Sequence, residues 1–380
     1  MNSQLCKRLG IEFPLFAFSH CRDVVAAVSN AGGMGVFGAV TLPPEDLDAE
    51  LSWIDAHVNG KPYGVDLIVP DSFTSKGQEI TDEALLAMIP AAHKDFASAV
   101  LAEHDVDDEG LEEDRARHLF FRENLSEAGA AASLEVAFSH PIKLIANALG
   151  VPPPIMLEMG KKNDVAVAAL LGTREHALRQ VAAGVDILIA AGGEAGGHTG
   201  DASTMVLIPE IVAALEEIGS DVPVLAAGGI ATGAQMAAAM AMGAAGAWCG
   251  SVWLTTAEAE TNPVVKEKML AATSRDTVRS RSRTGKPSRQ LRSPWTDAWE
   301  TRGPEPLPMP LQTLVSEPAL HKLDRLAAGG HQGAGELATY WVGQAVGLMN
   351  QTMSTGAVVQ GFKEDYLKAY ERLQRVMGDI

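Results

Sequence analysis

The stretch AAGGEAGGHTG, Ala190–Gly200, is where this sequence gathers residues that could support chemistry. Glycines crowd the approach to a single histidine, His198, directly after the apolar run VDILI. Glycine loses much conformational entropy on folding, so such a run indicates either a backbone with positive φ or a close approach to a ligand. Histidine changes its charge near neutral pH and often acts as a general acid or base. The stretch therefore predicts a ligand-facing loop with His198 as the candidate catalytic residue.

Two further stretches of small residues, AAGGI and CGS, each follow a short apolar run. In barrels of eight strands, the loops after the seventh and eighth strands commonly bind phosphate through backbone N–H groups and a helix N-terminus. Gly228 and Gly229 would let the backbone approach an anion, while Gly250 and Ser251 would add an amide and a hydroxyl. The alternative is that both stretches are tight barrel turns without a ligand.

The elements that must position these residues follow a repeating pattern. Eight short apolar runs lack polar alternation, which is typical of strands buried on both faces of a parallel sheet. Amphipathic segments that end in glycine lie between most of them, such as TREHALRQVAAG with Thr173 at the predicted N-cap. Repeated strand–helix units favour an α/β fold, the closed (β/α)8 TIM barrel, with its site at the C-terminal ends of the strands. The predicted strands are 13–18, 34–39, 63–69, 142–146, 165–171, 185–190, 223–227 and 246–250.

Two long segments depart from this alternation. One is too long for a simple loop and predicts a helical insertion after the third strand, placed to cover the barrel mouth. The other follows the last strand and contains the helical patterns LATYWVGQAVGLMNQT and EDYLKAYERLQRVM. The predicted division is a barrel of residues 1–70 and 136–275, a helical insertion of residues 71–135, and a basic loop with C-terminal helices packed on the barrel in residues 276–380.

Composition limits the class of protein. The 380 residues are 47% apolar, which is ample for a core, and no run of about 18 apolar residues predicts a membrane span. The net charge of −18 argues against non-specific binding to nucleic acid. The three scattered cysteines lack zinc-site spacing, so we predict no metal site. Together with an N-terminus that lacks an apolar signal core, they indicate a cytoplasmic protein.

A basic run between Arg275 and Arg292 is the local exception to this acidic balance. A solvated loop is the simplest interpretation. The alternative is a patch for the anionic tail of a substrate, such as a phosphate or a coenzyme A group. Its basic residues are Arg275, Arg279, Arg281, Arg283, Lys286, Arg289 and Arg292.

The motifs taken together resemble the nitronate monooxygenase family, which are FMN-dependent barrels. The specific part of the resemblance lies in GGEAGGHTG and PVLAAGGIATGAQMAAAMAMGAAGAWCGS. FPLFAFSHCRDVVAAVSNAGGMGVFGA, KPYGVDLIV, TGKPSRQLR and YWVGQAVGL extend it over most of the chain apart from the insertion. The resemblance implies FMN as cofactor and His198 as the base that removes the acidic proton α to a nitro group. The residues it implies for FMN binding are Ala17, Phe18, Ser19, Asp66, Gly196, Gly197, Ala227, Gly228, Gly229, Gly250 and Ser251.

The activity implied by the resemblance is the oxidation of alkyl nitronates or nitroalkanes by O2 to carbonyl compounds and nitrite. The partners are then a small-molecule substrate and O2, with no nucleic acid and no membrane, and a homo-oligomer stays open. The alternative is an FMN-dependent reductase that uses NAD(P)H on an enoyl thioester or a quinone, because some relatives with the same GGH element do so. A third reading, from another class, is a barrel that binds a phosphorylated ligand without turnover.

Three sites depart from the pattern of the family. The tripeptide Ala17-Phe18-Ser19 stands where an Ala-Pro-Met run is usual, Ala191 replaces glutamine, and Asp66 replaces asparagine. A carboxylate only accepts hydrogen bonds, whereas an amide also donates. An ionised Asp66 beside a flavin would make its reduction harder, unless the carboxyl group is protonated or paired.

Several other residues have simpler interpretations. His20 and Cys21 follow the first predicted strand and are expected to line the pocket, because chain neighbours rarely face each other as a nucleophilic pair. Glu194 is expected to fix a backbone amide or a helix start. Tyr340 and Trp341 have helical spacing, which favours a place in the core over closing the site.

Overall fold

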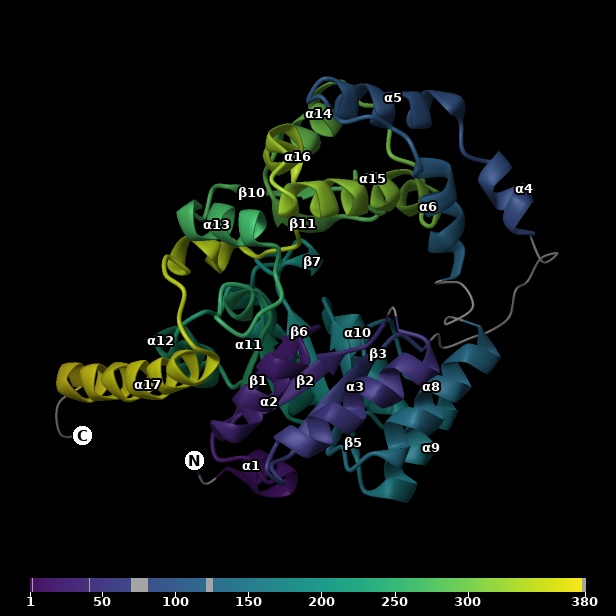
Figure 1. Cartoon of the computed structure of the whole chain (residues 1–380). Helices are drawn as coiled ribbons and strands as arrows, with labels where there is room; N and C mark the ends of the chain where they lie inside the picture. Colours follow the sequence, from purple (N-terminus) through teal and green to yellow (C-terminus); the bar gives the residue numbers. More distant parts are fainter. Residues whose placement is uncertain (2, 41, 70–80, 121–125, 378–380) are drawn as a thin grey trace.

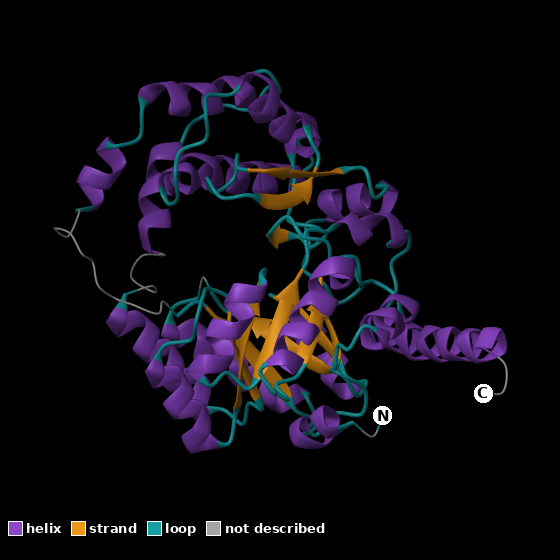
Figure 2. Ribbon diagram, turned by 180° about the vertical axis from the view of Figure 1, so that it is seen from behind, coloured by secondary structure: helices purple, strands orange, loops and turns teal. Residues whose placement is uncertain are grey.

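The computed structural model describes residues 1, 3–40, 42–69, 81–120 and 126–377. Eight parallel strands close into a barrel in the order β1-β2-β3-β4-β5-β6-β8-β9, seen in Figures 1 and 2. The predicted TIM barrel and all eight predicted strands are confirmed. The strands are β1 (Leu15–Ser19), β2 (Met34–Gly38), β3 (Tyr63–Leu67), β4 (Leu144–Asn147), β5 (Ala166–Leu171), β6 (Ile187–Ala191), β8 (Val224–Ala227) and β9 (Gly246–Cys249).

Small residues occupy several of the inward positions at the C-terminal ends of the barrel strands. Side chains at alternate positions point inward, where large apolar groups such as Phe16 fill the lower layers. At the upper end the inward positions include the small residues Gly38, Ala146, Ala191 and Ala227 and the larger Phe18, Asp66 and Trp248. These side chains together line the barrel mouth.

Helices cover the outer face of the barrel, and the sequence identified the N-terminal cap of one of them. The Thr173 hydroxyl accepts a hydrogen bond from the His176 N–H, which confirms the predicted N-cap of α10. Helix α17 (Thr355–Met377) packs on α12 and α2 and then runs away from the barrel (Figure 1). The remaining barrel helices are α1 (Gln4–Leu9), α2 (Arg22–Asn30), α3 (Pro44–His57), α8 (Glu127–Ser139), α9 (Pro154–Asn163), α10 (Arg174–Ala183), α11 (Thr204–Glu217) and α12 (Gly233–Ala241).

A second hydrophobic core lies beside the barrel and joins two distant parts of the sequence. Helices from the predicted insertion share this core with helices that follow β9. The predicted boundary at residue 135 falls inside α8, which packs on barrel helices α3 and α9. The elements of this second layer are α4 (Asp82–Ala87), α5 (Ala91–Ala102), α6 (Leu111–Arg117), η1 (His118–Phe120), α13 (Pro263–Ala271), α14 (Pro294–Arg302), α15 (Leu311–Ala328), α16 (Gln332–Leu337) and η3 (Gln344–Leu348). The short η2 (Ser251–Trp253) packs in the barrel core instead.

A small antiparallel sheet connects the barrel to the second layer. It consists of β10 (Thr277–Ser280), β11 (Ser288–Leu291) and the two-residue β7 (Gly197–His198), in the order β10-β11-β7. In Figure 1 this sheet lies between the barrel strands and helices α14 to α16. The expectation of a basic loop at this point is therefore wrong, because the run is the β10–β11 hairpin.

The predicted helix over 337–352 is also wrong in its centre. Helix α16 ends at Leu337 and η3 begins at Gln344, with an irregular segment between them. Tertiary hydrogen bonds hold this segment: the Leu291 N–H donates to the Tyr340 carbonyl, and the Gln344 N–H donates to that of Glu194.

Among the described helices, none is long and apolar enough to cross a membrane.

Candidate active site

His198 lies at the barrel mouth on β7, beyond the C-terminal end of β6. Its backbone pairs with Ser288 of β11, so the small sheet fixes the position of the His198 main chain, from which the imidazole projects. The Nε2 atom lies 2.8 Å from the Oγ1 of Thr284. The ring remains exposed, and its neighbour Gly197 has φ +77° with open space where a side chain would be. The sheet and the Thr284 hydroxyl thus orient an imidazole that still has one open edge.

The surroundings of His198 favour its neutral form. Partial desolvation of the imidazole by the protein on its covered side, followed by the positive charges of Lys286 and Arg283, lowers the pKa of His198 below its usual 6.5. Glu317 opposes this effect and does not reverse it. A neutral imidazole at pH 7 has a lone pair, so His198 can act as a base at neutral pH.

Arginines from the β10–β11 hairpin form hydrogen bonds with the loop of residues 192–200, here called the glycine loop. Arg289 donates two hydrogen bonds to the Gly193 carbonyl, from Nε at 3.0 Å and from Nη2 at 2.8 Å. Arg279 donates to the Thr199 carbonyl at 3.1 Å. The basic run is therefore neither only a solvated loop nor only a patch for a substrate anion, because these two guanidinium groups bind backbone carbonyl groups of the protein. Within the described chain, the Lys286 ammonium has no such partner and is exposed beside His198.

The glycines of the loop serve packing as well as ligand approach. A Cβ at Gly192 would lie 2.2 Å from the Thr204 Oγ1, and one at Gly196 would lie 2.8 Å from the Val342 carbonyl carbon. These two glycines face protein, so their first role is to let the loop pack. The Glu194 carboxylate accepts from the Thr204 N–H at 2.8 Å and caps α11, which confirms its expected role at a helix start.

Trp341 is a neighbour of His198, although the sequence interpretation favoured a place in the core over closing the site. Its ring centroid lies 6.4 Å from that of His198. The Arg283 guanidinium lies 3.9 Å from the Trp341 centroid and pairs with the buried Glu317, with an Nε–Oε1 distance of 2.6 Å. The signal was hidden because the segment 338–343 looks helical in sequence, while tertiary hydrogen bonds hold it irregular.

The opposite side of the mouth is formed by the ends of β1 and β2. Phe18 is half-buried, and its ring centroid lies 5.0 Å from that of His20. The His20 Nδ1 lies 2.7 Å from the Gly38 carbonyl, so this nitrogen carries the proton and donates. The protein around His20 lowers its pKa by desolvation, while the Gly38 hydrogen bond opposes the shift. Ala17 is completely buried beneath this end.

Ser19, His20 and Cys21 do not form a catalytic pair. The Ser19 hydroxyl accepts from the Cys21 N–H at 3.1 Å and so closes a local turn. The Cys21 thiol donates to the Glu258 carbonyl at 3.1 Å, and burial raises its pKa. The geometry agrees with the expectation that His20 and Cys21 do not act as nucleophile and base.

Asp66 occupies an inward position near the upper end of β3. It pairs in register with Gly38 on one side and Ala146 on the other, and the rings of Phe18 and His20 lie over Gly38. Only 1% of Asp66 is exposed, and neither carboxyl oxygen has a hydrogen-bond partner within the described chain. Burial raises the pKa of Asp66 well above its usual 3.8.

The loops after β8 and β9 present unpaired backbone donors. Gly228 and Gly229 have φ of +99° and +72°, a conformation that favours glycine. Within the described residues, the N–H groups of Gly229 and Gly250 have no acceptor. The Ser251 hydroxyl accepts from the Gly343 N–H at 2.8 Å, which ties the loop to the Trp341 segment. Ala227 is a buried residue beneath these loops.

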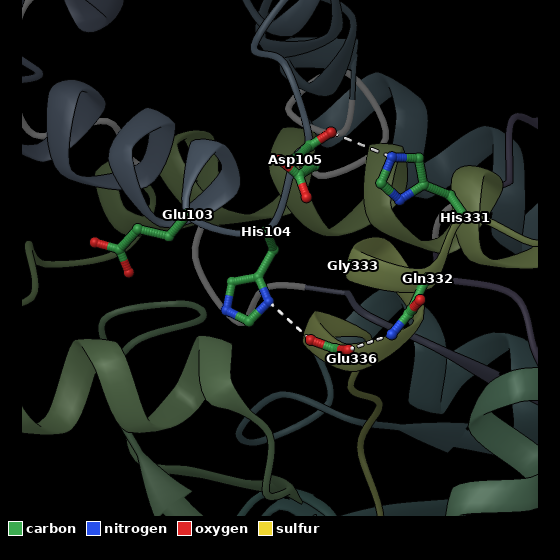
Figure 3. A pocket seen from close by; sticks show the side chains of 7 residues that line it. All are labelled: Glu103, His104, Asp105, His331, Gln332, Gly333 and Glu336. Carbon is green, nitrogen blue, oxygen red and sulfur yellow. Dashed lines mark hydrogen bonds and ion pairs between the residues drawn. The ribbon is translucent and has the colours of Figure 1, made fainter.

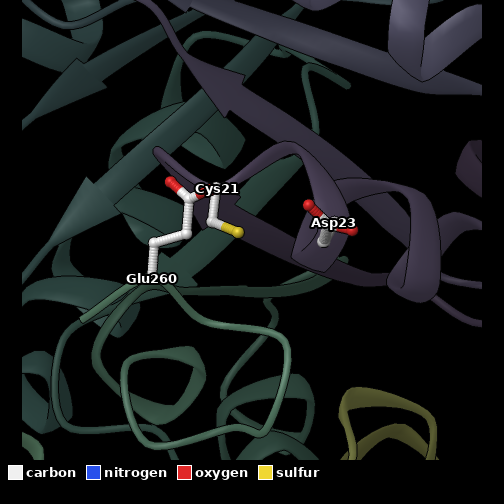
Figure 4. A group of neighbouring side chains, drawn as sticks. All are labelled: Cys21, Asp23 and Glu260. Carbon is white, nitrogen blue, oxygen red and sulfur yellow. The ribbon is translucent and has the colours of Figure 1, made fainter. Parts of the chain in front are cut away.

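Two other polar clusters in the described residues carry no catalytic assignment. Cys21, Asp23 and Glu260 lie close together (Figure 4), but the thiol already donates to a carbonyl and the other side chains are not buried. The pocket in Figure 3, of about 290 Å³, lies between α5 and α16 and contains the His104–Glu336 pair. It belongs to the second layer, away from the C-terminal strand ends where barrel chemistry occurs.

The fold and the mouth together define a barrel enzyme whose site lies at the C-terminal strand ends. The family model for nitronate monooxygenase matches residues 2–365, and the chain belongs to that family. It is therefore an oxidoreductase of a family that uses FMN.

Comparisons with individual proteins agree with this assignment. "Putative monooxygenase Rv1533" of Mycobacterium tuberculosis is 51% identical over 98% of this chain and 99% of its own length. "Probable nitronate monooxygenase" of Staphylococcus haemolyticus is 28% identical over 90% of this chain and 91% of its own. The fold resembles the crystal structure of nitroalkane oxidase from Streptomyces ansochromogenes, with a TM-score of 0.77 and 22% identity, over 98% of this chain and 100% of that one.

The residues at the mouth fit a flavin mononucleotide. The mouth has small inward residues such as Ala146 and Ala191, beside the rings of Phe18 and His20 that cover Gly38. The unpaired N–H groups of Gly229 and Gly250 suit a phosphate. The unpaired carboxyl of Asp66 is a buried polar group that lacks a protein partner. Buried polar groups are normally hydrogen-bonded, so this one is suited to a polar ligand edge.

Proposed function

We propose that this protein binds FMN at the barrel mouth and oxidises alkyl nitronates with O2 to carbonyl compounds and nitrite. The observation that carries this proposal is the proximity of an oriented and exposed imidazole, His198, to the Lys286 cation, which has no ion-pair partner among the described residues. A base beside a positive charge suits a substrate that becomes, or already is, an anion. Bound FMN would supply the electron acceptor and the site of reaction with oxygen.

The residues of the chain have separable roles in this proposal. The backbone N–H groups of Gly229 and Gly250 would bind the phosphate, and the inward-facing Phe18 and Asp66 would lie against the ring. The Nδ1 edge of His198 would accept the α proton of a neutral nitroalkane, while its Nε2 keeps the Thr284 hydrogen bond. Lys286 would attract the resulting nitronate.

The Thr284 hydroxyl also bears on which imidazole nitrogen is free. It lies 3.3 Å from the Lys286 carbonyl, to which it can donate. A hydroxyl that donates there accepts from an Nε2–H of His198, which leaves Nδ1 without a proton. This arrangement gives the base the tautomer that the proposed role needs.

The experiment that tests the function is an anaerobic titration of the purified protein, with the visible flavin band as the readout. We expect no bleaching by NADPH or NADH, and a spectral response to an alkyl nitronate. Rapid stoichiometric bleaching by NADPH would instead support the reductase acting on an enoyl thioester or a quinone. The arginines paired within the chain weaken that alternative, because they are not free to bind the phosphates of such partners.

A further inference from the structure

Asp66 is a buried acid for which the protein provides no counterpart. Its two carboxyl oxygens have no hydrogen-bond donor among the described residues, although the residue is 1% exposed. The outward neighbours Val65 and Leu67 pack under the helices, so Asp66 itself faces the barrel interior. A packing defect does not explain this arrangement, because a buried polar group without a partner destabilises the folded protein.

Among the described residues, the groups around Asp66 also provide no positive charge. Desolvation is what raises its pKa, and no charged side chain contributes. On the inside of the barrel its strand neighbours are Gly38 and Ala146, which carry no titratable group. The titratable group at this strand end is His20, which donates from Nδ1 to the Gly38 carbonyl and has a lowered pKa. An ionised carboxylate in this place would lack both solvent and counter-ion.

We propose that Asp66 is a neutral carboxylic acid in the folded protein, and that it forms a two-point hydrogen bond with an amide-like edge of the bound cofactor. This inference rests on the proposed binding of FMN. A carboxylic acid has one O–H donor and one carbonyl acceptor on adjacent atoms. The matching chemistry is a cyclic edge that presents C=O and N–H side by side, as the pyrimidine part of a flavin does.

The proposal also assigns a consequence to the aspartate itself. A neutral acid presents the donor and acceptor pattern of an amide. Protonated Asp66 can therefore form the same two hydrogen bonds as an asparagine without adding charge. Asp66→Asn should therefore be nearly neutral for binding and for the reduction potential. Asp66→Leu has a similar size but neither hydrogen-bonding group, so it should lose the contact.

The binding test uses apoprotein of the wild type, Asp66→Asn and Asp66→Leu, titrated with FMN and separately with riboflavin, with flavin fluorescence as the readout. We expect Asp66→Asn to bind within about threefold of the wild type. Loss of two hydrogen bonds in Asp66→Leu should weaken both ligands by the same factor, about tenfold to a hundredfold. Equal weakening places the contact on the ring, since riboflavin lacks the phosphate. Unchanged binding by Asp66→Leu would overturn the contact.

A second measurement addresses protonation without relying on turnover. The infrared difference spectrum between wild type and Asp66→Asn at pH 7 should contain the carbonyl band of a protonated carboxyl group, shifted in D2O. A carboxylate band instead, or a marked rise in the flavin midpoint potential in Asp66→Asn, would show that the acid is ionised and overturn the proposal. Failure to oxidise nitronates would sink the proposed function, yet the infrared band and the flavin affinities would still decide this inference.

Discussion

The two sides of the barrel mouth satisfy their polar groups in different ways. On the glycine-loop side the protein supplies the partners: Arg289 bonds Gly193, and Thr284 bonds His198. On the β1–β3 side the buried carboxyl of Asp66 has no partner within the described chain. A polar group satisfied by the protein is held in place before any ligand arrives, whereas an unsatisfied one gains its partner on binding. The comparison separates a preorganised catalytic side from a ligand-completed side.

The two histidines at the mouth follow the same division. Both have lowered pKa values, chiefly because the protein displaces water from around the rings. The Nδ1 of His20 donates a hydrogen bond to the Gly38 carbonyl, a backbone group that does not take part in proton transfer. His198 is held by a hydroxyl and lies beside the Lys286 charge. We therefore expect proton transfer on the glycine-loop side.

The largest expected effect comes from His198→Asn. We expect kcat/KM for a neutral nitroalkane to fall by about 10²–10⁴-fold, the usual contribution of a general base. Activity on preformed nitronates should fall far less, and the flavin should stay bound. Steady-state kinetics with both substrates check this. Equal losses on both would remove the general-base role.

The wild-type pH profile sharpens the same assignment. Because the pKa of His198 lies below 6.5, its neutral form prevails at pH 7. We expect kcat/KM for a neutral nitroalkane to stay level through pH 7 and to fall only as acidification protonates the imidazole. An acidic limb centred above 6.5 would mean that another group is the base.

Thr284→Val should have the next largest effect. It removes the 2.8 Å hydrogen bond to His198 Nε2, and one hydrogen bond is typically worth about 0.5–1.5 kcal/mol. We expect kcat on a neutral nitroalkane to fall up to about tenfold with little change in KM. Thr284→Ser keeps the hydroxyl and should restore most of the activity. If Thr284→Ser is as impaired as the valine variant, the hydroxyl does not position the base.

Lys286→Met should have a smaller and salt-dependent effect. Removing its charge should raise the pKa of His198 and move the acidic limb of the pH profile upward. The KM for a nitronate should rise up to about fivefold, because an exposed charge contributes at most about 1 kcal/mol. Lys286→Arg is the matched control. An effect that persists unchanged at high salt would contradict an electrostatic role.

His20→Asn should have the smallest effect and is the sharpest way to break the comparison. Asparagine can still donate to the Gly38 carbonyl, so we expect kcat/KM to change within about twofold. The same kinetic assay on both substrates measures it. A loss comparable to that of His198→Asn would place proton transfer on the β1–β3 side and reverse the assignment.

Local patterns were sufficient for the barrel. Each strand is a short apolar run and most barrel helices end at a glycine or begin at a cap such as Thr173, so the eight units could be predicted. The site was harder, because its pieces come from distant segments. Trp341 was placed in a helix by its spacing, while the hydrogen bond from Leu291 to the Tyr340 carbonyl holds that segment irregular. The basic run gave no local sign that Arg289 and Arg279 would bind backbone carbonyls.

The sequence by itself determined the barrel, the family likeness and the identity of His198 as the residue to test, because these depend on local patterns and contiguous motifs. Only the tertiary structure decided the protonation environment. Whether Asp66 has a partner depends on the groups that lie beside it across β2 and β4. Whether His198 is neutral depends on charges from β10–β11 and the loop between them. Burial and electrostatic interactions are sums over neighbours in space, and chain order does not list those neighbours.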